Sequence, residues 1–230
     1  MKPERLITSE DVLARMGKAG IIPVVVIEDP ANAVQLGRTI LDAGLDIIEI
    51  TMRTEKAMEA VRVLCKKLPE ILVGAGTIFS IPTAKKALSL GARFIVSPHL
   101  DEQIVTYCAR KDIVSVPGAF TPSEVQRAIE AARKGSRRKS IKDLPLVIKI
   151  FPASTGGPSH ITAMKAVFPD VKFLPLGGVN ASNLSEYLRG GSWAVGGTWI
   201  CKKELIDSSN FAQVSQLIKD ARALIDAARK

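Results

Sequence analysis

Residues 146–151 read LVIKIF, an apolar run that carries a single lysine, Lys149. Short runs of this kind are typical of strands in a parallel sheet that is covered on both faces. Comparable runs recur at intervals of roughly 20–25 residues, with a longer gap at 119–145. The others are IIPVVVI (21–27), DIIEITM (46–52), ILVGAG (71–76), RFIVS (93–97), IVSVPG (113–118), VKFLPLGG (171–178) and WAVGGT (193–198). Amphipathic stretches separate them, so the chain is predicted to repeat a βα unit.

The repeated unit predicts one α/β domain over residues 1–230, folded as a (β/α)8 TIM barrel. Right-handed crossovers make such a sheet parallel, and about 250 residues is the usual length of this barrel. The composition is 47% hydrophobic but only 5% aromatic, so the core must consist mainly of Val, Ile, Leu and Ala. An open doubly wound sheet is the alternative, although it usually has fewer strands.

Capping residues predict where several helices begin and end. Thr121 and Glu124 form a capping-box pattern that begins a helix, and Gly135 follows its expected end near Lys134. Asn180 is expected to cap a helix over 181–189. Further helices are expected after Asp29-Pro30 as far as Gly44, over 209–229, and over Ser9–Lys18, where an N-terminal helix would cover the barrel floor.

The chain carries a net charge of +9, and ten residues hold much of it. The segment RKGSRRKSIK (133–142) contains six Lys or Arg and is expected to be an exposed loop. RNA binding is an alternative for this segment. We expect no nucleic-acid partner, because no RNA-recognition motif or interleaved aromatic residues accompany the charge.

Other residue counts limit the cofactors and the compartment. The three cysteines, Cys65, Cys108 and Cys201, are an odd number and lie far apart in the sequence. They therefore predict free thiols in a reducing cytoplasm. His99 and His160 are the only histidines, which argues against a His-rich metal site. The beginning, MKPERLITSEDV, resembles neither a signal peptide nor a membrane span, and no apolar run approaches 18 residues. We therefore expect a cytoplasmic protein without a metal, cofactor or membrane partner.

Strand alternation places Lys149 on the same face as Val147 and Phe151, and leaves the other face fully apolar. Lys149 should therefore point into the barrel. Burial disfavours an ammonium ion, lowers its pKa and makes the amine a usable nucleophile. A structural ion pair is the alternative interpretation of a single lysine in a strand.

The second strand, within IIEITMRT (47–54), supplies a partner by the same alternation. Glu49 should point inward together with Thr51, and Arg53 should lie at the carboxyl-terminal mouth, where active sites of these barrels are found. A Glu49–Lys149 salt bridge could be purely structural. However, a buried ion pair stabilises a fold poorly, which favours a working role.

Glycine-rich strand ends predict where a ligand approaches the backbone. VGAGT (73–77) ends the third run, and Thr77 offers a hydroxyl and an N–H group there. Gly177, Gly178, Gly197 and Thr198 follow the last two runs, which is the usual phosphate-binding region of this fold. Simple tight turns are the alternative.

The ordered motifs EITMRT, GAGT, SPHLDE, PGAFTPSE, KIFPAS, PLGGVN and GGTW together resemble the 2-keto-3-deoxy-6-phosphogluconate (KDPG) and 4-hydroxy-2-oxoglutarate (KHG) aldolases over about residues 8–225. The resemblance implies a homotrimeric class I aldolase, with no cofactor, acting on a small 2-keto acid or sugar-acid phosphate. It implies that Lys149 forms the Schiff base and that Glu49 is the general acid/base. The substrate-binding residues it implies are Arg53, Thr77, Phe151, Gly177, Gly178, Gly197 and Thr198.

Three features depart from the family pattern. Leu176 occupies the position of a family threonine, Ser154 follows FPA where the family often has glutamate, and residues 134–145 resemble an insertion. The first change leaves the exact sugar acid and its stereochemistry open, so a KDPGal aldolase is an alternative. A phosphate-binding isomerase or epimerase, or a barrel without catalytic activity, are the remaining alternatives.

Overall fold

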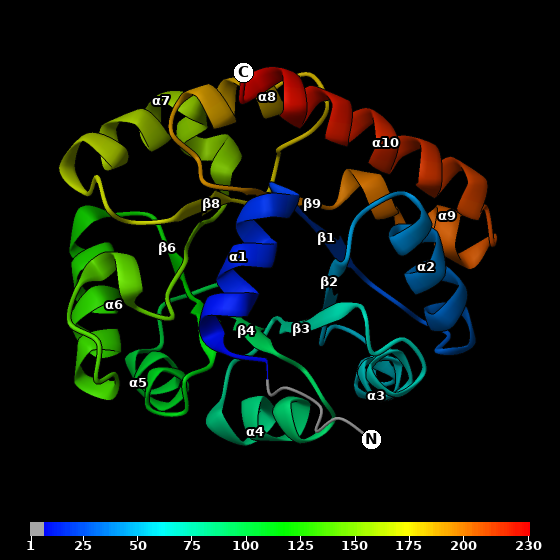
Figure 1. The fold of residues 1–230 in the computed structure, drawn as a ribbon, viewed down its shortest axis with the longest axis horizontal. Coiled ribbons are helices and arrows are strands. Elements are labelled where there is room, and N and C mark those ends of the chain that lie inside the picture. The colour runs from blue at the N-terminus through cyan, green and yellow to red at the C-terminus, as the bar shows by residue number, and fades with distance from the viewer. Residues whose placement is uncertain (1–6) are drawn as a thin grey trace.

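The computed structural model describes residues 7–230 as a group of parallel strands surrounded by helices (Figure 1). The first six residues of the MKPERLITSEDV segment lie outside the described residues. The strands are β1 (Ile21–Val25), β2 (Ile47–Thr51), β3 (Leu72–Gly76), β4 (Phe94–Val96), β5 (Val114–Val116), β6 (Gly118–Ala119), β7 (Ile148–Ile150), β8 (Phe173–Pro175) and β9 (Val195–Gly197).

The strands form a curled parallel arrangement in two hydrogen-bonded sheets. One sheet has the order β5-β4-β3-β2-β1-β9 and the other β6-β7-β8. A parallel bridge between Ser115 and Leu146 links the first sheet to the chain that enters β7. On the other side, the Trp193 N–H donates to the Phe173 carbonyl at 2.9 Å and links β9 to β8. The predicted α/β class and parallel sheet are therefore confirmed.

Each predicted run forms a strand, but the fifth run forms two. It divides at Pro117, between β5 and β6. Proline has no N–H to donate and so interrupts a ladder. The Pro117 carbonyl is still used, because it accepts the Lys149 N–H at 3.0 Å. The Pro117 carbonyl therefore connects β7 to the chain at the point where β5 ends and β6 begins.

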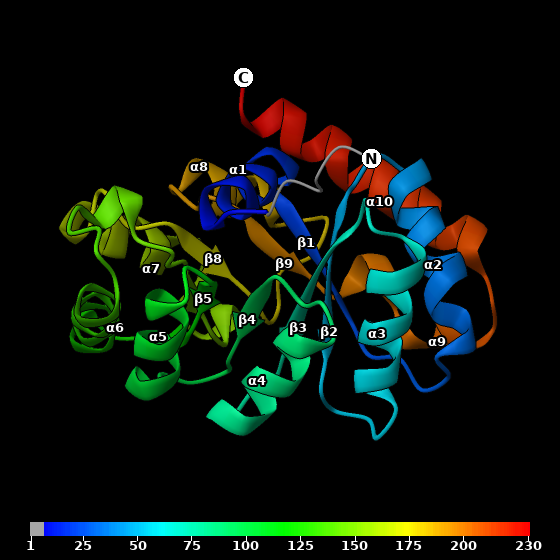
Figure 2. The same cartoon turned by 60° about the horizontal axis from the view of Figure 1, so that its bottom comes forward.

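After α1, helices alternate with the strands and lie outside them (Figure 2). They are α1 (Ser9–Ala19), α2 (Ala31–Asp42), α3 (Ala57–Lys67), α4 (Ile81–Ser89), α5 (Glu102–Arg110), α6 (Pro122–Gly135), α7 (Ala153–Val167), α8 (Leu184–Arg189), α9 (Lys203–Asp207) and α10 (Phe211–Ala228), with short 3-10 turns η1 (Ile141–Asp143) and η2 (Trp199–Cys201).

Of two capping predictions, one is confirmed and the other is wrong. The Thr121–Glu124 capping box is present and begins α6. The prediction that Asn180 caps a helix over 181–189 was wrong, because α8 begins at Leu184 after Asn183. The Asn180 side chain instead accepts the N–H of Ser182 at 2.9 Å. An Asx turn of this kind competes with helix capping.

The core has an inner and an outer part. Side chains of the inner strand faces, among them Val147 and Leu174, form one apolar cluster, and Val12 and Met16 of α1 join it. Helix α1 lies across the middle of the ring of helices in Figure 1. The outer strand faces pack against the surrounding helices in a second cluster that includes Ile148 and Ile150. This division leaves only the inner faces available for polar chemistry.

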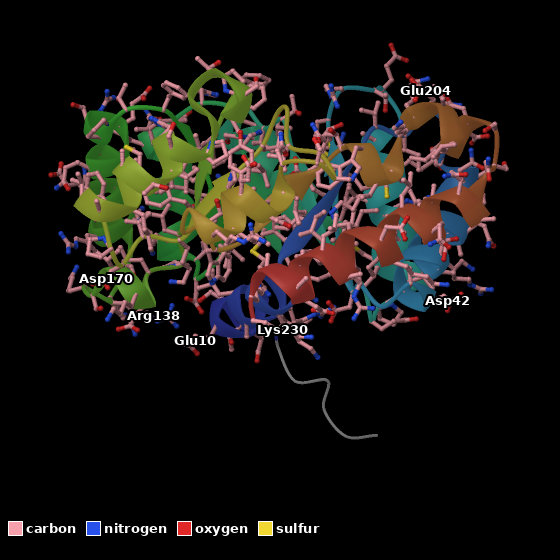
Figure 3. All side chains as sticks on the ribbon, turned by 90° about the horizontal axis from the view of Figure 1, so that it is seen from above. Glu10, Asp42, Arg138, Asp170, Glu204 and Lys230 are labelled. Carbon is pink, nitrogen blue, oxygen red and sulfur yellow. The ribbon has the colours of Figure 1, made fainter. Side chains whose placement is uncertain are left out.

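The basic segment 133–142 is only partly the exposed loop that we expected. Its first residues belong to α6, and Arg138 folds back onto the start of α1. The Arg138 guanidinium donates to Glu10 at 2.8 Å and to Ser9 at 3.0 Å, and also pairs with Asp112. Arg138 and Glu10 lie at one edge of the molecule in Figure 3, and Glu204 lies at the opposite edge. Arg138 thus connects the start of α1 to Asp112, which follows α5.

Within residues 7–230, every helix is too short or too polar to cross a bilayer. The three cysteines Cys65, Cys108 and Cys201 are free thiols, as the sequence predicted.

Arg138→Ala should lower the free energy of unfolding by about 1–2 kcal/mol, because it removes charge-assisted hydrogen bonds from Glu10, Ser9 and Asp112. Urea denaturation measures this change. Arg137→Ala is the matched control, because Arg137 is exposed and no hydrogen bond or ion pair is seen for it in residues 7–230. Equal destabilisation by the two variants would contradict the anchoring role.

Candidate active site

Lys149 lies in the middle of β7, and its side chain is on the inner face of the sheet. Its neighbours Ile148 and Ile150 belong to the outer cluster and Val147 to the inner one. In the sheet, Lys149 pairs with Gly118 of β6 and Leu174 of β8. Its exposed fraction is only 5%. The strand alternation read from the sequence therefore predicted its direction correctly.

Burial lowers the pKa of Lys149 below its ordinary value. The charge of Glu49 opposes this shift, and the charge of Arg53 adds to it. A lysine with a lowered pKa holds a larger fraction of neutral amine near physiological pH, and only the neutral amine can attack a carbonyl. The Lys149 ammonium also lies over the ring of Phe151, with 4.6 Å between Nζ and the ring centroid.

Glu49 lies on the inner face of β2 and is 3% exposed. Burial raises the pKa of its carboxyl group, against the opposing charges of Lys149 and Arg53. The strand order places β1, β9 and β8 between β2 and β7, so the two side chains approach across the interior. No direct Glu49–Lys149 ion pair forms between these described residues. The structure therefore does not contain the structural Glu49–Lys149 salt bridge that was the alternative interpretation.

The polar ends of Glu49 and Lys149 retain access to solvent. Neither side chain has a hydrogen-bond partner among residues 7–230. Within the same residues, Ser192 Oγ is the only fully enclosed side-chain N or O atom that lacks a partner. Water can therefore reach the Glu49 carboxylate oxygens and Lys149 Nζ.

Two glycines of β3 have a steric purpose that the sequence did not reveal. We expected VGAGT to allow a ligand close to the backbone. Instead, a β-carbon at Gly76 would lie 1.9 Å from Oε1 of Glu49, and one at Gly74 would lie 2.1 Å from the Phe94 ring. Gly76 thus provides the space that the carboxylate occupies. The register, with Glu49 beside Gly74, would have been the signal to look for.

Arg53 follows β2 and is held by its neighbours. Its Nε donates to Thr51 Oγ1 at 3.3 Å, and Thr51 Oγ1 donates to the Val25 carbonyl at 2.9 Å. Arg53 influences the pKa of both Glu49 and Lys149, so its guanidinium lies near them. The structure therefore brings together the three charged residues that the sequence singled out.

Thr77 follows β3 in a strained backbone conformation. Its φ angle is +61°, in the left-handed region that a β-branched residue rarely adopts. Such strain costs about 1–3 kcal/mol and is characteristic of functional sites. The Thr77 side chain has no hydrogen-bond partner among the described residues, so its hydroxyl is available to a ligand.

The glycine-rich ends of β8 and β9 have different surroundings. Gly177 and Gly178 have φ angles of +88° and +89°, which favour glycine. The Gly177 carbonyl accepts the Ser154 N–H at 2.9 Å, and this holds the β8 loop against the turn after β7. A β-carbon at Gly197 would lie 2.8 Å from Ile21, so this glycine is needed for packing.

Free backbone donors remain in these loops. The N–H groups of Gly178 and Thr198 have no acceptor among residues 7–230. Thr198 is exposed, and its side chain makes no capping hydrogen bond at the start of η2. The structure thus leaves donors at the carboxyl ends of two neighbouring strands, where the sequence predicted anion binding.

Leu176, at the family-threonine position, belongs to the apolar inner cluster and is 6% exposed. A β-carbon at Gly196 would lie 2.5 Å from Leu176 Cδ1, so Leu176 fills the space above this glycine of β9. Ser154 lies at the start of α7, beside Gly178. In the part of the chain that the structure describes, no group of three or more His, Cys, Asp or Glu could hold a metal ion.

Comparisons with known proteins agree with this arrangement. The KDPG and KHG aldolase family model matches residues 12–217. The 2-dehydro-3-deoxy-phosphogluconate aldolase of Pseudomonas aeruginosa is 34% identical over 213 residues, covering 92% of this chain and 90% of the relative. The KHG/KDPG aldolase of Escherichia coli is 29% identical over 203 residues, covering 87% and 90%.

A solved structure extends the similarity to three dimensions. It is the KDPG aldolase of Legionella pneumophila, captured with pyruvate as a covalent carbinolamine intermediate. It matches with a TM-score of 0.82 at 30% identity, covering 93% of this chain and 97% of that one. The match over nearly the whole chain confirms the resemblance read from the motifs: the chain belongs to the KDPG and KHG aldolase family.

Proposed function

We propose that this chain is a class I aldolase that cleaves a 2-keto-3-deoxy-6-phospho sugar acid to pyruvate and glyceraldehyde 3-phosphate. The observation that carries the proposal is the buried amine of Lys149, whose pKa is lowered and which borders accessible space near the Glu49 carboxyl group. The names of the Pseudomonas aeruginosa and Escherichia coli relatives support the choice of substrate.

In the proposed mechanism, the neutral amine of Lys149 attacks the C2 ketone of the substrate. The resulting carbinolamine loses water to form a protonated imine, which accepts the electron pair of the C3–C4 bond as this bond breaks. The aldehyde leaves, and the enamine that remains takes up a proton and is hydrolysed to pyruvate and free Lys149. The imine itself is the electron sink.

Glu49 is the proposed general acid/base. Burial raises its pKa above the ordinary value, which is the direction that favours general acid/base catalysis at neutral pH. It would remove the C4 hydroxyl proton, directly or through a water molecule, and assist the carbinolamine steps.

The remaining predicted residues would bind the two ends of the substrate. Arg53, which can bind a carboxylate bidentately, and the strained Thr77 would hold the carboxylate next to C2. Phe151 would cover the reacting carbons beside Lys149. Gly177, Gly178, Gly197 and Thr198 would form the phosphate site, in which the free N–H groups of Gly178 and Thr198 are the donors.

Leu176 bears on the range of substrates. Its apolar side chain offers no hydrogen bond to a substrate hydroxyl on this side of the site. This favours activity toward 4-hydroxy-2-oxoglutarate as well, because that substrate has a shorter chain and carries no phosphate. Its cleavage would give pyruvate and glyoxylate.

We further propose that residues 1–230 form a single closed (β/α)8 barrel whose amino-terminal end is covered by α1. The bridge at Ser115 and the hydrogen bond at Trp193 support closure, and the packing of Val12 and Met16 supports the cap. A cytoplasmic homotrimer is proposed from the resemblance to the family, and the free thiols are consistent with a reducing compartment.

Borohydride reduction in the presence of pyruvate should attach a reduced three-carbon unit to Lys149, as detected by peptide mass spectrometry. Lys172 is an internal control, because burial lowers its pKa too but its Nζ donates to the Lys142 carbonyl at 2.6 Å. Lys149→Ala should remove both the label and pyruvate release. An active preparation that carries no label on Lys149 would refute the mechanism.

Glu49→Gln should lower kcat by about 10²–10⁴-fold, the usual contribution of a general acid/base, while pyruvate can still be trapped on Lys149. Pyruvate release from a panel of 2-keto-4-hydroxy acids provides kcat. Wild-type turnover in this variant would exclude Glu49 from proton transfer.

Gly76→Ala should reduce kcat by roughly tenfold or more, because a methyl group occupies the place of the Glu49 carboxylate and displaces it. Gly76 is not among the glycines with positive φ, so the backbone accepts alanine and the variant should fold. Steady-state kinetics and a thermal unfolding curve check both points. Unchanged kcat in a folded variant would show that the carboxylate need not lie there.

A further inference from the structure

Thr51 lies between the two charged residues of β2 and is 2% exposed. It shares the inner face with Glu49, yet the mechanism above gives it no task. Its hydroxyl donates to the Val25 carbonyl at 2.9 Å, and Thr51 Oγ1 in turn accepts the Arg53 Nε–H at 3.3 Å. The side chain therefore connects Arg53 to the neighbouring strand β1.

The first of these hydrogen bonds determines how the second can form. A threonine hydroxyl has one proton and two lone pairs. Because the proton is directed to the Val25 carbonyl, a lone pair remains for the Arg53 N–H. The hydroxyl cannot rotate to present its proton to the guanidinium without losing a buried hydrogen bond.

The backbone around Arg53 is fixed independently of Thr51. The Met52 N–H donates to the Gly76 carbonyl of β3 at 2.8 Å. The Thr54 hydroxyl donates to the Ile27 carbonyl at 2.6 Å. Loss of the Thr51 hydroxyl would therefore leave the chain path in place and release mainly the guanidinium.

A guanidinium can bind a carboxylate through its two Nη atoms or through Nε and one Nη. Thr51 occupies Nε, whereas the Arg53 Nη groups have no partner among residues 7–230. Binding through the two Nη atoms is therefore the mode that remains open to a carboxylate. It sets the plane in which a bound carboxylate must lie, and with it the direction of the adjoining C2 carbon.

We infer that Thr51 is a positioning residue, which orients Arg53 so that its two Nη groups bind the carboxylate of the 2-keto acid. The inference rests on the proposed function, because it takes Arg53 as the carboxylate-binding residue. Thr51 itself does not touch the reacting atoms. Its removal should weaken recognition of the carboxylate more than it slows the chemical steps.

The test compares Thr51→Val, Thr51→Ser and the control Thr39→Val. Valine has nearly the shape of threonine but no hydroxyl, and serine keeps the hydroxyl. Thr39 is a matched control, because its buried hydroxyl also donates to a carbonyl, that of Gln35 at 2.9 Å in α2. It therefore reports the effect of losing a buried hydroxyl outside the site.

Two readouts separate positioning from stability. Thr51→Val should raise KM by roughly tenfold and change kcat by less than about threefold, whereas Thr51→Ser and Thr39→Val should stay within about twofold of wild type. Borohydride trapping should also lose its preference for pyruvate over methyl pyruvate in Thr51→Val, because the ester has no carboxylate. Thr51→Ala replaces Thr51→Val if the latter does not fold.

The outcomes are distinguishable from failure of the proposed function. If wild-type Lys149 is not trapped by pyruvate at all, the aldolase mechanism fails. If wild type is trapped and prefers pyruvate, but Thr51→Val keeps the same preference and KM, only the inference about Thr51 is overturned. A KM increase of equal size in Thr39→Val would also overturn it.

Discussion

The structure depends on keeping an amine and a carboxyl group together in the interior of a parallel sheet. Burial disfavours both charges, so it lowers the pKa of Lys149 and raises that of Glu49. The two groups do not form a direct ion pair, which would have stabilised both charged forms. Each is therefore closer to exchanging a proton near neutral pH than it would be in water, and this is what imine chemistry needs.

The sheet creates this environment by simple alternation. On β2 and β7, Ile48, Ile50, Ile148 and Ile150 point outward to the helices, whereas Glu49 and Lys149 lie on the inner face. Toward the amino-terminal end, Met16 of α1 packs in the inner apolar cluster. Toward the carboxyl-terminal end, Gly76 leaves room for Glu49, and the strained Thr77 follows directly. On these strands, the residues that pack the core and the residues proposed for catalysis thus occupy different positions.

The sequence predicted those features that local patterns control. Strand positions, the inward direction of Lys149 and the Thr121 capping box follow from residues a few positions apart, and the structure contains them. Features that depend on long-range contacts could not be predicted. The steric need for Gly76 requires the register of β2 and β3, and the anchoring by Arg138 requires α1 to be in place. Asn180 had two local options, and the sequence did not distinguish them.

The lowered pKa of Lys149 is the central claim, and it can be measured directly. Proteins with ¹³C-labelled lysine ε-carbons should show, in an NMR titration, a resonance with a midpoint clearly below 10.5 that disappears in Lys149→Ala. This disappearance distinguishes it from the resonances of Lys165 and Lys172, whose pKa values burial also lowers. Because the charge of Glu49 raises this pKa, Glu49→Gln should move the midpoint to still lower pH. If the resonance assigned to Lys149 titrates at the ordinary lysine value, the amine is not primed by burial and the account is contradicted.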